Sequence, residues 1–277
     1  MLLLIQPLFY AKLRILGKTI SQWMKANQEN IDRFNDRADN YNKYRPGYPD
    51  ALLTFLFTYN QITSSSCVLE VGAGTGILSQ KIATWGCRLT AMEPNDQMRA
   101  KAQAALQQFS NCNVVCGSAE NTGLPNESVD LIVCAQAFHW FNMQAARAEF
   151  QRILKNGKQV AIIWNMRNTE TAFEQEYQQV ILKFSIDYLT VIKREERGND
   201  LATFFHQGTF VQKQFVYDTY LTFEQLLGRT LSYSYMPNTG HPASHEMTKA
   251  LQLLFDQHQY KGLVGLSYHT KLFIGTL

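Results

Sequence analysis

Short apolar runs alternate with segments of helical periodicity through the middle of the chain. Each run is too short for a buried helix, so each predicts a buried strand. Between the runs, apolar residues recur three or four positions apart, as in Leu78, Ile82 and Trp85 before the helix-stopping Gly86. Strands that alternate with helices predict a parallel sheet with right-handed crossovers. The five predicted strands span residues 67–71, 88–92, 113–116, 129–134 and 159–164.

The pattern changes after residue 165. Helical periodicity dominates around 173–184 and 247–258, and a capping-box pattern at Thr222 and Gln225 predicts a further helix. The runs 210–221 and 263–275 predict two long strands that pair antiparallel at one sheet edge. We therefore expect an α/β fold with a mostly parallel seven-stranded sheet, an antiparallel edge pair and helices on both faces. No Pro- or Gly-rich linker divides the chain, which favours one domain over 30–277 with a helical insertion at 165–205.

Composition agrees with one globular domain. The chain has 277 residues, of which 45% are hydrophobic and 18% charged, enough for a sizeable core. A net charge of +3 is too weak to argue for nucleic acid, and no basic stripe is present. The cysteines are odd in number and lack metal-ligand spacing, so we expect buried reduced thiols in a cytoplasmic protein and no metal site. These cysteines are Cys67, Cys87, Cys112, Cys116 and Cys134.

The first 29 residues are expected to form an extension outside the domain. Residues 1–20 are apolar at first, but no charge precedes the run, and Pro7 and polar residues interrupt it well short of a membrane span. Leu13, Leu16 and Ile20 can line one face of an amphipathic helix that touches a membrane surface. A poorly ordered extension, or a true start at Met24, is an equally good interpretation.

A glycine-rich loop follows the first predicted strand. Gly72, Gly74 and Gly76 permit a tight turn and a close approach of backbone to a ligand. The second strand ends at Glu93, whose carboxylate can accept hydrogen bonds from both ribose hydroxyls of an adenosine. The combination of strand, glycine loop, helix, strand and acid is far more specific than the loop alone. The dinucleotide fingerprint would require a glycine at position 77, which is Ile77.

The alternating glycines after Glu70 resemble the first motif of class I S-adenosylmethionine-dependent methyltransferases. The later motifs resemble that family in order: 93–95, 117–120, 124–132 and 153–157. Within the family, the chain is most similar to methyltransferase type 11 proteins of the trans-aconitate methyltransferase-like branch. The residues that carry this likeness are Phe34, Ala38, Tyr41, 44–46, 48–49 and 135–141, with a weaker match at 232–235.

The resemblance implies S-adenosylmethionine as the cofactor and residues 30–60 as an N-terminal lid over it. Many relatives carry Asp where this chain has Ser118, so backbone groups or Glu120 are expected to share the adenine contact. The cofactor-binding residues implied are Tyr44, Arg45, Glu70, Gly72, Ala73, Gly74, Gly76, Glu93, Pro94, Met98, Ser118, Ala119, Glu120, Ala135 and Gln136.

Two side chains are candidates for chemistry near the methyl group. His139 follows the fourth strand and can act as a base, or it can close the cofactor pocket with its aromatic neighbours. Arg45 can pair with a carboxylate of cofactor or substrate, or stack on the tyrosines around it. Some aromatic residues of the C-terminal part can line an acceptor pocket, although core packing is their default interpretation. These are Tyr233, Tyr235, Phe255 and Tyr260.

Three functions remain open. The chain can methylate a small-molecule acceptor, for which a carboxylic acid is one candidate. It can bind the cofactor without catalysis and serve a partner, because methyl transfer requires no obligatory catalytic side chain. An NAD-type oxidoreductase is the third, against which Ile77 and the motif after the fourth strand both count.

Overall fold

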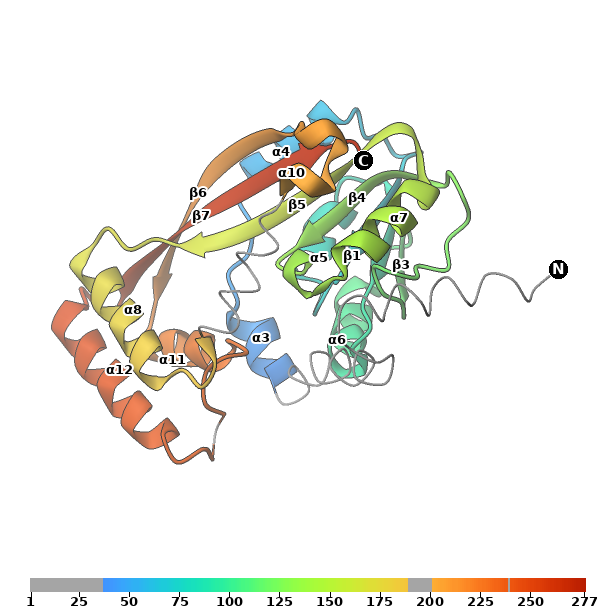
Figure 1. Cartoon of the computed structure of the whole chain (residues 1–277). Coiled ribbons are helices and arrows are strands. Elements are labelled where there is room, and N and C mark those ends of the chain that lie inside the picture. The colour runs from blue at the N-terminus through green and yellow to red at the C-terminus, as the bar shows by residue number, and fades with distance from the viewer. Residues whose placement is uncertain (1–36, 189–200, 239) are drawn as a thin grey trace, which may run out of the picture.

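A computed structural model describes residues 37–188, 201–238 and 240–277. The interpretations of residues 1–29 and of Met24 lie outside the described residues. Seven strands form one sheet in the order β3-β2-β1-β4-β5-β7-β6 (Figure 1). The strands are β1 (Cys67–Val71), β2 (Arg88–Met92), β3 (Cys112–Val115), β4 (Val129–Ala135), β5 (Leu154–Arg167), β6 (Val211–Leu221) and β7 (Val264–Gly275).

The predicted sheet is confirmed. Strands β1 to β5 pair parallel, and β7 pairs antiparallel with both β5 and β6. Strand order reverses between β1 and β4, which is where ligands bind in open α/β sheets, beyond the carboxyl ends of the strands.

The fifth strand differs from its prediction at both ends. It begins at Leu154, directly after the preceding helix, and runs to Arg167. Its register with β4 shifts between Val129 and Leu131, and Gly157 has a φ of 72° within the strand. The motif at 153–157 therefore lies mostly inside β5 as an irregularity, because the chain already pairs with β4 at Leu154, before the position where the strand was predicted to begin.

Helices cover both faces and one end of the sheet. Four of them begin at a side-chain cap: Asn95 and Asn142 accept hydrogen bonds from Met98 N and Ala145 N, and Thr171 and Thr222 form capping boxes, the second of which the sequence predicted. The helical segments are α3 (Ala38–Tyr44), α4 (Asp50–Tyr59), α5 (Ile77–Ala83), α6 (Asp96–Leu106), η2 (Phe138–Trp140), α7 (Met143–Ile153), α8 (Ala172–Phe184), α10 (Leu201–Phe204), η3 (His206–Gly208), α11 (Phe223–Leu231) and α12 (Ser244–His258).

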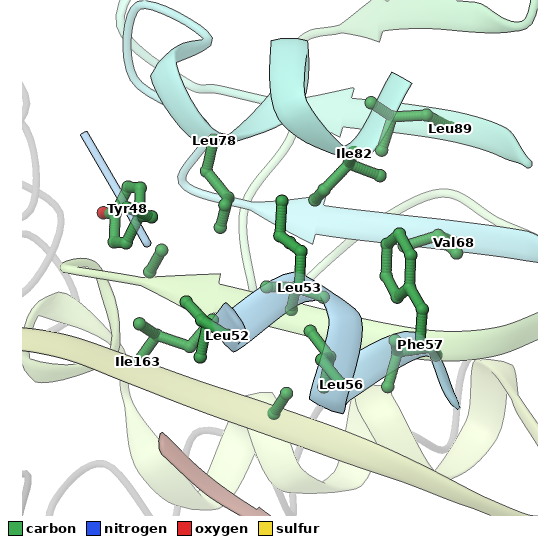
Figure 2. Close-up of a cluster of buried hydrophobic side chains, with 14 of the residues drawn as sticks. Tyr48, Leu52, Leu53, Leu56, Phe57, Val68, Leu78, Ile82, Leu89 and Ile163 are labelled. Atoms are coloured by element: carbon green, nitrogen blue, oxygen red, sulfur yellow. The ribbon is translucent and has the colours of Figure 1, made fainter. Parts of the chain in front are cut away.

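Alternate residues of the central strands feed two separate cores. Val68 belongs to one core together with Leu52 and Leu56 of α4 and Leu78 of α5, and Figure 2 shows its side chain beside the ring of Phe57. Its neighbour Leu69 points to the other face, where α7 and α10 pack. This alternation is the period of two expected of a strand buried on both sides.

A third core holds the C-terminal helices together at the far ends of β6 and β7 (Figure 1). Helices α8, α11 and α12 pack there around Leu266 and Tyr268 of β7. Helix α3 lies against α11 and is fixed there by Arg37, whose guanidinium donates to the backbone oxygens of Leu231, Tyr233 and Met236. The start of the predicted lid is thereby joined to the C-terminal helices.

The prediction of buried cysteines is wrong in part. Cys87 and Cys134 are buried, Cys67 and Cys112 are half-buried, and Cys116 is exposed. Cys116 lies just beyond the end of β3, an edge strand that only β2 covers. Separately, none of the helices in the described parts of the chain is long and apolar enough to cross a bilayer.

Candidate functional site

The glycine loop turns sharply between β1 and α5. Gly72, Gly74 and Gly76 have φ angles of 72°, 59° and 83°, a region that disfavours residues with a Cβ. The Gly72 and Ala73 amides both donate to the Met92 carbonyl, at 2.9 and 3.0 Å, which holds the loop over the end of β2. A Cβ on Gly72 would lie 2.5 Å from the Ala137 Cβ, so the loop also requires glycine for its close approach to the segment after β4.

Glu93 sits at the end of β2 beside this loop. Its side chain is only 7% exposed, and its two oxygens accept the Gly74 and Asn95 amides, each at 2.9 Å. Burial raises the pKa of Glu93, and these two hydrogen bonds oppose that shift. Because a carboxylate has about four lone-pair sites, both oxygens can still accept ligand hydroxyls.

The first cavity opens beside Glu93 and measures about 800 Å³ together with its opening to solvent. Apolar side chains such as Met98 form much of its wall, and Tyr41 of α3 closes one side. Its lining residues are Tyr41, Val71, Gly72, Gly74, Glu93, Pro94, Asn95, Met98, Gly117, Ser118, Ala119, Glu120, Ala135, Gln136, Ala137, Trp140 and Phe141.

The second cavity, about 400 Å³, adjoins the first and is lined by an acid and a cation. Glu70 is 1% exposed and accepts a 2.5 Å hydrogen bond from Ser79 Oγ. Burial raises the pKa of Glu70 to about 8, although the Ser79 hydrogen bond lowers it. Arg45 lies on the same cavity between the rings of Tyr41 and Tyr233, and its buried Nε has no hydrogen-bond partner among the described residues. The cavity therefore offers both an acid and a cation to a ligand.

The third cavity is larger, about 1180 Å³, and lies between the sheet and the C-terminal helices. It shares Tyr41 and Gln136 with both other cavities. Gln136 has a φ of 56°, which is unusual for a residue with a side chain. Two hydrogen bonds hold it in place: its backbone amide donates to Ile163 O, and its Nε2 donates to Asn165 O. Its other lining residues include Arg45, His139, Trp140, Arg167, Gln178, Tyr188, Tyr233, Tyr235 and Tyr268.

The structure gathers most of the predicted cofactor-binding residues around the first two cavities. Arg45, Glu70 and Ala73 line the second, and ten others line the first. Those ten are Gly72, Gly74, Glu93, Pro94, Met98, Ser118, Ala119, Glu120, Ala135 and Gln136.

Two predicted cofactor-binding residues line none of the three cavities. Tyr44 points to α11 instead: its hydroxyl donates to Glu224 Oε1 at 2.7 Å, and its ring fills the space above Gly228. Gly76 begins α5, and a Cβ there would lie 3.3 Å from the Ala102 Cα of α6. Both residues take part in packing one helix against another, which keeps them out of the cavity walls.

His139 lies in η2 and lines the third cavity rather than the first. Its ring contacts that of Trp140, with 4.9 Å between the ring centroids. Among the aromatic candidates of the C-terminal part, Tyr233 and Tyr235 also line the third cavity. Phe255 packs in the core with the C-terminal helices, and Tyr260 is 74% exposed.

Several residues of the site were not predicted from the sequence. Asn165 and Arg167 follow the buried part of β5, and Gln178 and Tyr188 come from α8 and the segment after it. The rule that ligands bind at the carboxyl ends of parallel strands points to Asn165 and Arg167. No sequence signal indicated Gln178 or Tyr188, because only the packing of α8 brings them to the cavity.

This sheet order and the cavity at the β1–β2 edge define a Rossmann-like methyltransferase fold. Residues 69–162 match the family described as "Methyltransferase domain". The chain is also similar to a solved structure, a putative type II methyltransferase from Anaeromyxobacter dehalogenans. That likeness has a TM-score of 0.64 at 20% identity and covers 84% of this chain and 98% of the other.

Curated relatives carry the same description. An uncharacterized methyltransferase of Schizosaccharomyces pombe is 34% identical over 149 residues, which cover 53% of this chain and 58% of the relative. A second protein of that yeast, described as methyltransferase-like, is 29% identical with 62% of its length covered, so the chain spans about three fifths of each. An uncharacterized methyltransferase of Mycobacterium bovis is 29% identical over 203 residues, 73% of this chain and 76% of that protein.

Proposed function

We propose that the protein transfers the methyl group of S-adenosylmethionine to a small-molecule acceptor. The observation that carries the proposal is the buried Glu93 carboxylate, held by the Gly74 and Asn95 amides at the edge of the first cavity. A carboxylate fixed in this way can accept both ribose hydroxyls. The apolar wall around Met98 and Ala119 suits the flat face of an adenine ring.

The second cavity fits the other end of the same molecule. The methionine part carries an ammonium and a carboxylate, and the cavity presents Glu70 and Arg45. Glu70 is buried with a pKa near 8, so a ligand ammonium beside it would favour its ionised form. The buried Arg45 Nε can still donate a hydrogen bond to a ligand.

The same charges argue against a nicotinamide dinucleotide. Glu70, the buried acid that precedes the glycine loop, borders the second cavity. A pyrophosphate there would oppose the ionisation of Glu70, whereas the ammonium of S-adenosylmethionine would favour it. The absence of glycine at position 77 agrees with this preference.

Bound S-adenosylmethionine would supply a methyl group already activated on a sulfonium. The protein's own residues then need to orient the acceptor and exclude water. Tyr41, Gln136 and Trp140 line both the first and the third cavity, so the reacting atoms are expected to meet beside them. His139 faces the acceptor side and is a candidate base for an acceptor that holds its proton tightly.

A comparison of thermal unfolding tests the cofactor. S-adenosylmethionine and S-adenosylhomocysteine should each stabilise the protein, by about 2.7 kcal/mol at 100 times the dissociation constant. NAD at the same concentration should give no shift. Equal shifts with all three compounds, or a shift with NAD alone, would reject the proposal.

The second candidate function is cofactor binding without catalysis. Radiolabelled S-adenosylmethionine incubated with a metabolite panel separates the two, because only an enzyme moves the label into an acceptor. Small carboxylic acids should head the panel, since the third cavity carries Arg167 as well as Arg45. Tight cofactor binding with no labelled product from any acceptor class would favour the non-catalytic role.

A further inference from the structure

The third cavity carries positive charge without a matching acid. Arg45 and Arg167 line it, and Arg229 lies behind Tyr268. No Asp or Glu is among its lining residues in the described ranges. Within those ranges, none of the three arginines comes within 4.0 Å of a carboxylate oxygen. Because buried charges in proteins are normally paired, this cavity is suited to an anion.

Arg167 is held firmly by neutral partners. Its Nη1 donates to Tyr235 Oη and its Nη2 to Gln178 Oε1, each at 2.8 Å, and its guanidinium carbon lies 4.9 Å from the Tyr233 ring centre. A guanidinium has about five N–H donors in a rigid fork, so this group keeps donors for a ligand. Its geometry is fixed before a ligand arrives, which reduces the entropy lost on binding.

The tyrosine between these arginines reports their combined field. Burial alone would raise the pKa of Tyr233, yet Arg167, Arg45, Arg229 and the hydrogen bond with Tyr268 together bring the pKa below its usual value. A field that favours a phenolate also favours a carboxylate placed beside the same cations.

Arg167 is also separated from the place where methyl transfer is expected. Asn165 borders the second and third cavities, whereas Arg167 borders only the third. Two residues along a strand span about 6.6 Å, and Gln178 and Tyr235 hold the Arg167 side chain toward the C-terminal helices. The guanidinium therefore lies toward the end of the cavity away from the glycine loop.

We propose that Arg167 anchors a carboxylate of the acceptor, and that the methyl group is transferred to an atom outside this carboxylate. The inference rests on the proposed function and specifies the acceptor for it. The acceptor has an acid at the Arg167 end, a body that packs against Trp140 and Tyr188, and a methyl-accepting atom near Tyr41 and Gln136. Arg167 is a specificity-determining residue of the acceptor cavity, separate from the cofactor site.

The test measures binding to the full-length protein saturated with S-adenosylhomocysteine. The probes are 4-hydroxyphenylacetate and glutarate, each paired with its amide, and phenyl phosphate, all titrated by calorimetry. In the wild-type protein at least one acid should bind tenfold or more tightly than its amide. Arg167→Gln should lower the affinity for that acid at least tenfold, leave the amide unchanged, and keep S-adenosylhomocysteine affinity within twofold. Arg167→Lys should recover part of the loss.

Arg88→Gln is the matched control, because Arg88 is exposed at the start of β2 and its side chain donates to Ser65 O, far from the cavities. It should leave every affinity unchanged. If Arg167→Gln fails to fold, the ratio of acid affinity to amide affinity is compared between the wild type and Gln178→Leu. This ratio should be smaller in Gln178→Leu.

Three results would overturn the inference: acids and amides that bind equally, a folded Arg167→Gln that keeps full acid affinity, or no acid binding at all. If phenyl phosphate binds more tightly than both acids, the group that Arg167 anchors is a phosphate rather than a carboxylate. If S-adenosylhomocysteine itself fails to bind, the proposed function fails; if it binds and the acids do not, only this inference fails.

Discussion

Glu70 and Glu93 are both buried beside the glycine loop, but their surroundings differ. Glu93 accepts two backbone amides, whereas among the described residues the Glu70 carboxylate accepts from a hydroxyl, Ser79 Oγ. Backbone amides favour the ionised form of Glu93, and burial favours the protonated form of Glu70. The two residues are therefore expected to affect ligand binding and stability differently.

Glu93→Ala should weaken S-adenosylmethionine binding by about 1–3 kcal/mol, the cost of lost hydrogen bonds to a charged group. Isothermal titration measures the change directly. Asp96→Asn is the control, because Asp96 is an exposed acid of α6 that pairs with Arg99. Unchanged affinity in Glu93→Ala would remove Glu93 from the binding site.

Glu70 should make the ligand-free protein less stable as the pH rises. Its pKa is about 8 in the folded protein against 4.5 for an unperturbed glutamate, so the folded state binds this proton more tightly than the unfolded chain. The stabilisation from Glu70 is complete below about pH 4.5 and is lost as the pH rises to about 8.

Relative to Glu70→Gln, the wild type should lose a few kcal/mol of unfolding free energy across that window, at about 1.36 kcal/mol per pKa unit. Urea denaturation at both ends of the window measures the difference, and Gln keeps an oxygen to accept from Ser79. A difference between the two proteins that does not change with pH would show that Glu70 ionises normally.

At the scale of elements, the packing of α3 against α11 fixes the position of one wall of the cavities. The Tyr44 ring lies directly over Gly228, and Arg229 Nε donates to Tyr44 O at 2.8 Å. The same segment carries Tyr41 and Arg45 to the cavities. Packing between helices distant in sequence thus positions two side chains of the candidate site.

Gly228→Ala should therefore reduce both stability and cofactor affinity. A Cβ there would lie 2.2 Å from Tyr44 Cδ2, and overpacking of this kind costs about 1–3 kcal/mol. Thermal unfolding and titration with S-adenosylhomocysteine measure the two effects. The double variant with Tyr44→Ala removes the clash and should destabilise by less than the sum of the single changes. Strict additivity would mean that the two residues do not meet.

On the scale of the whole molecule, different hydrophobic cores support different parts of the candidate site. The two cores on the faces of the central sheet support the glycine loop and Glu93, and the third supports the Arg167 end of the acceptor cavity. Helix α3 contacts elements of both parts, α6 and α11. A ligand that fills the first two cavities should therefore order α3 more than the outer helices.

Hydrogen exchange measures this distribution. S-adenosylhomocysteine should slow amide exchange in α3 and in the loop at 72–76, because both border the ligand cavities. Helix α12 lines none of these cavities and should exchange at the same rate with and without ligand. Protection of α12 as strong as that of α3 would contradict this distribution.

The sequence by itself determined the parallel strands, the glycine loop and the acid at the end of β2. These features follow from local patterns: apolar runs of strand length, backbone angles that require glycine, and a strand end that the chain reaches in order. The antiparallel edge pair was also predictable, because β6 and β7 are long runs of strand-forming residues.

Only the tertiary structure decided which side chains face a ligand. Tyr44 and Gly76 lie in matching motifs, yet helix packing uses both, and Gln178 and Tyr188 reach the third cavity only because α8 packs on β7. The start of β5 was likewise set by its pairing with β4 rather than by Gly157. Local propensity depends on neighbours in sequence, whereas the direction of a side chain depends on contacts between segments as far apart as Arg37 and Met236.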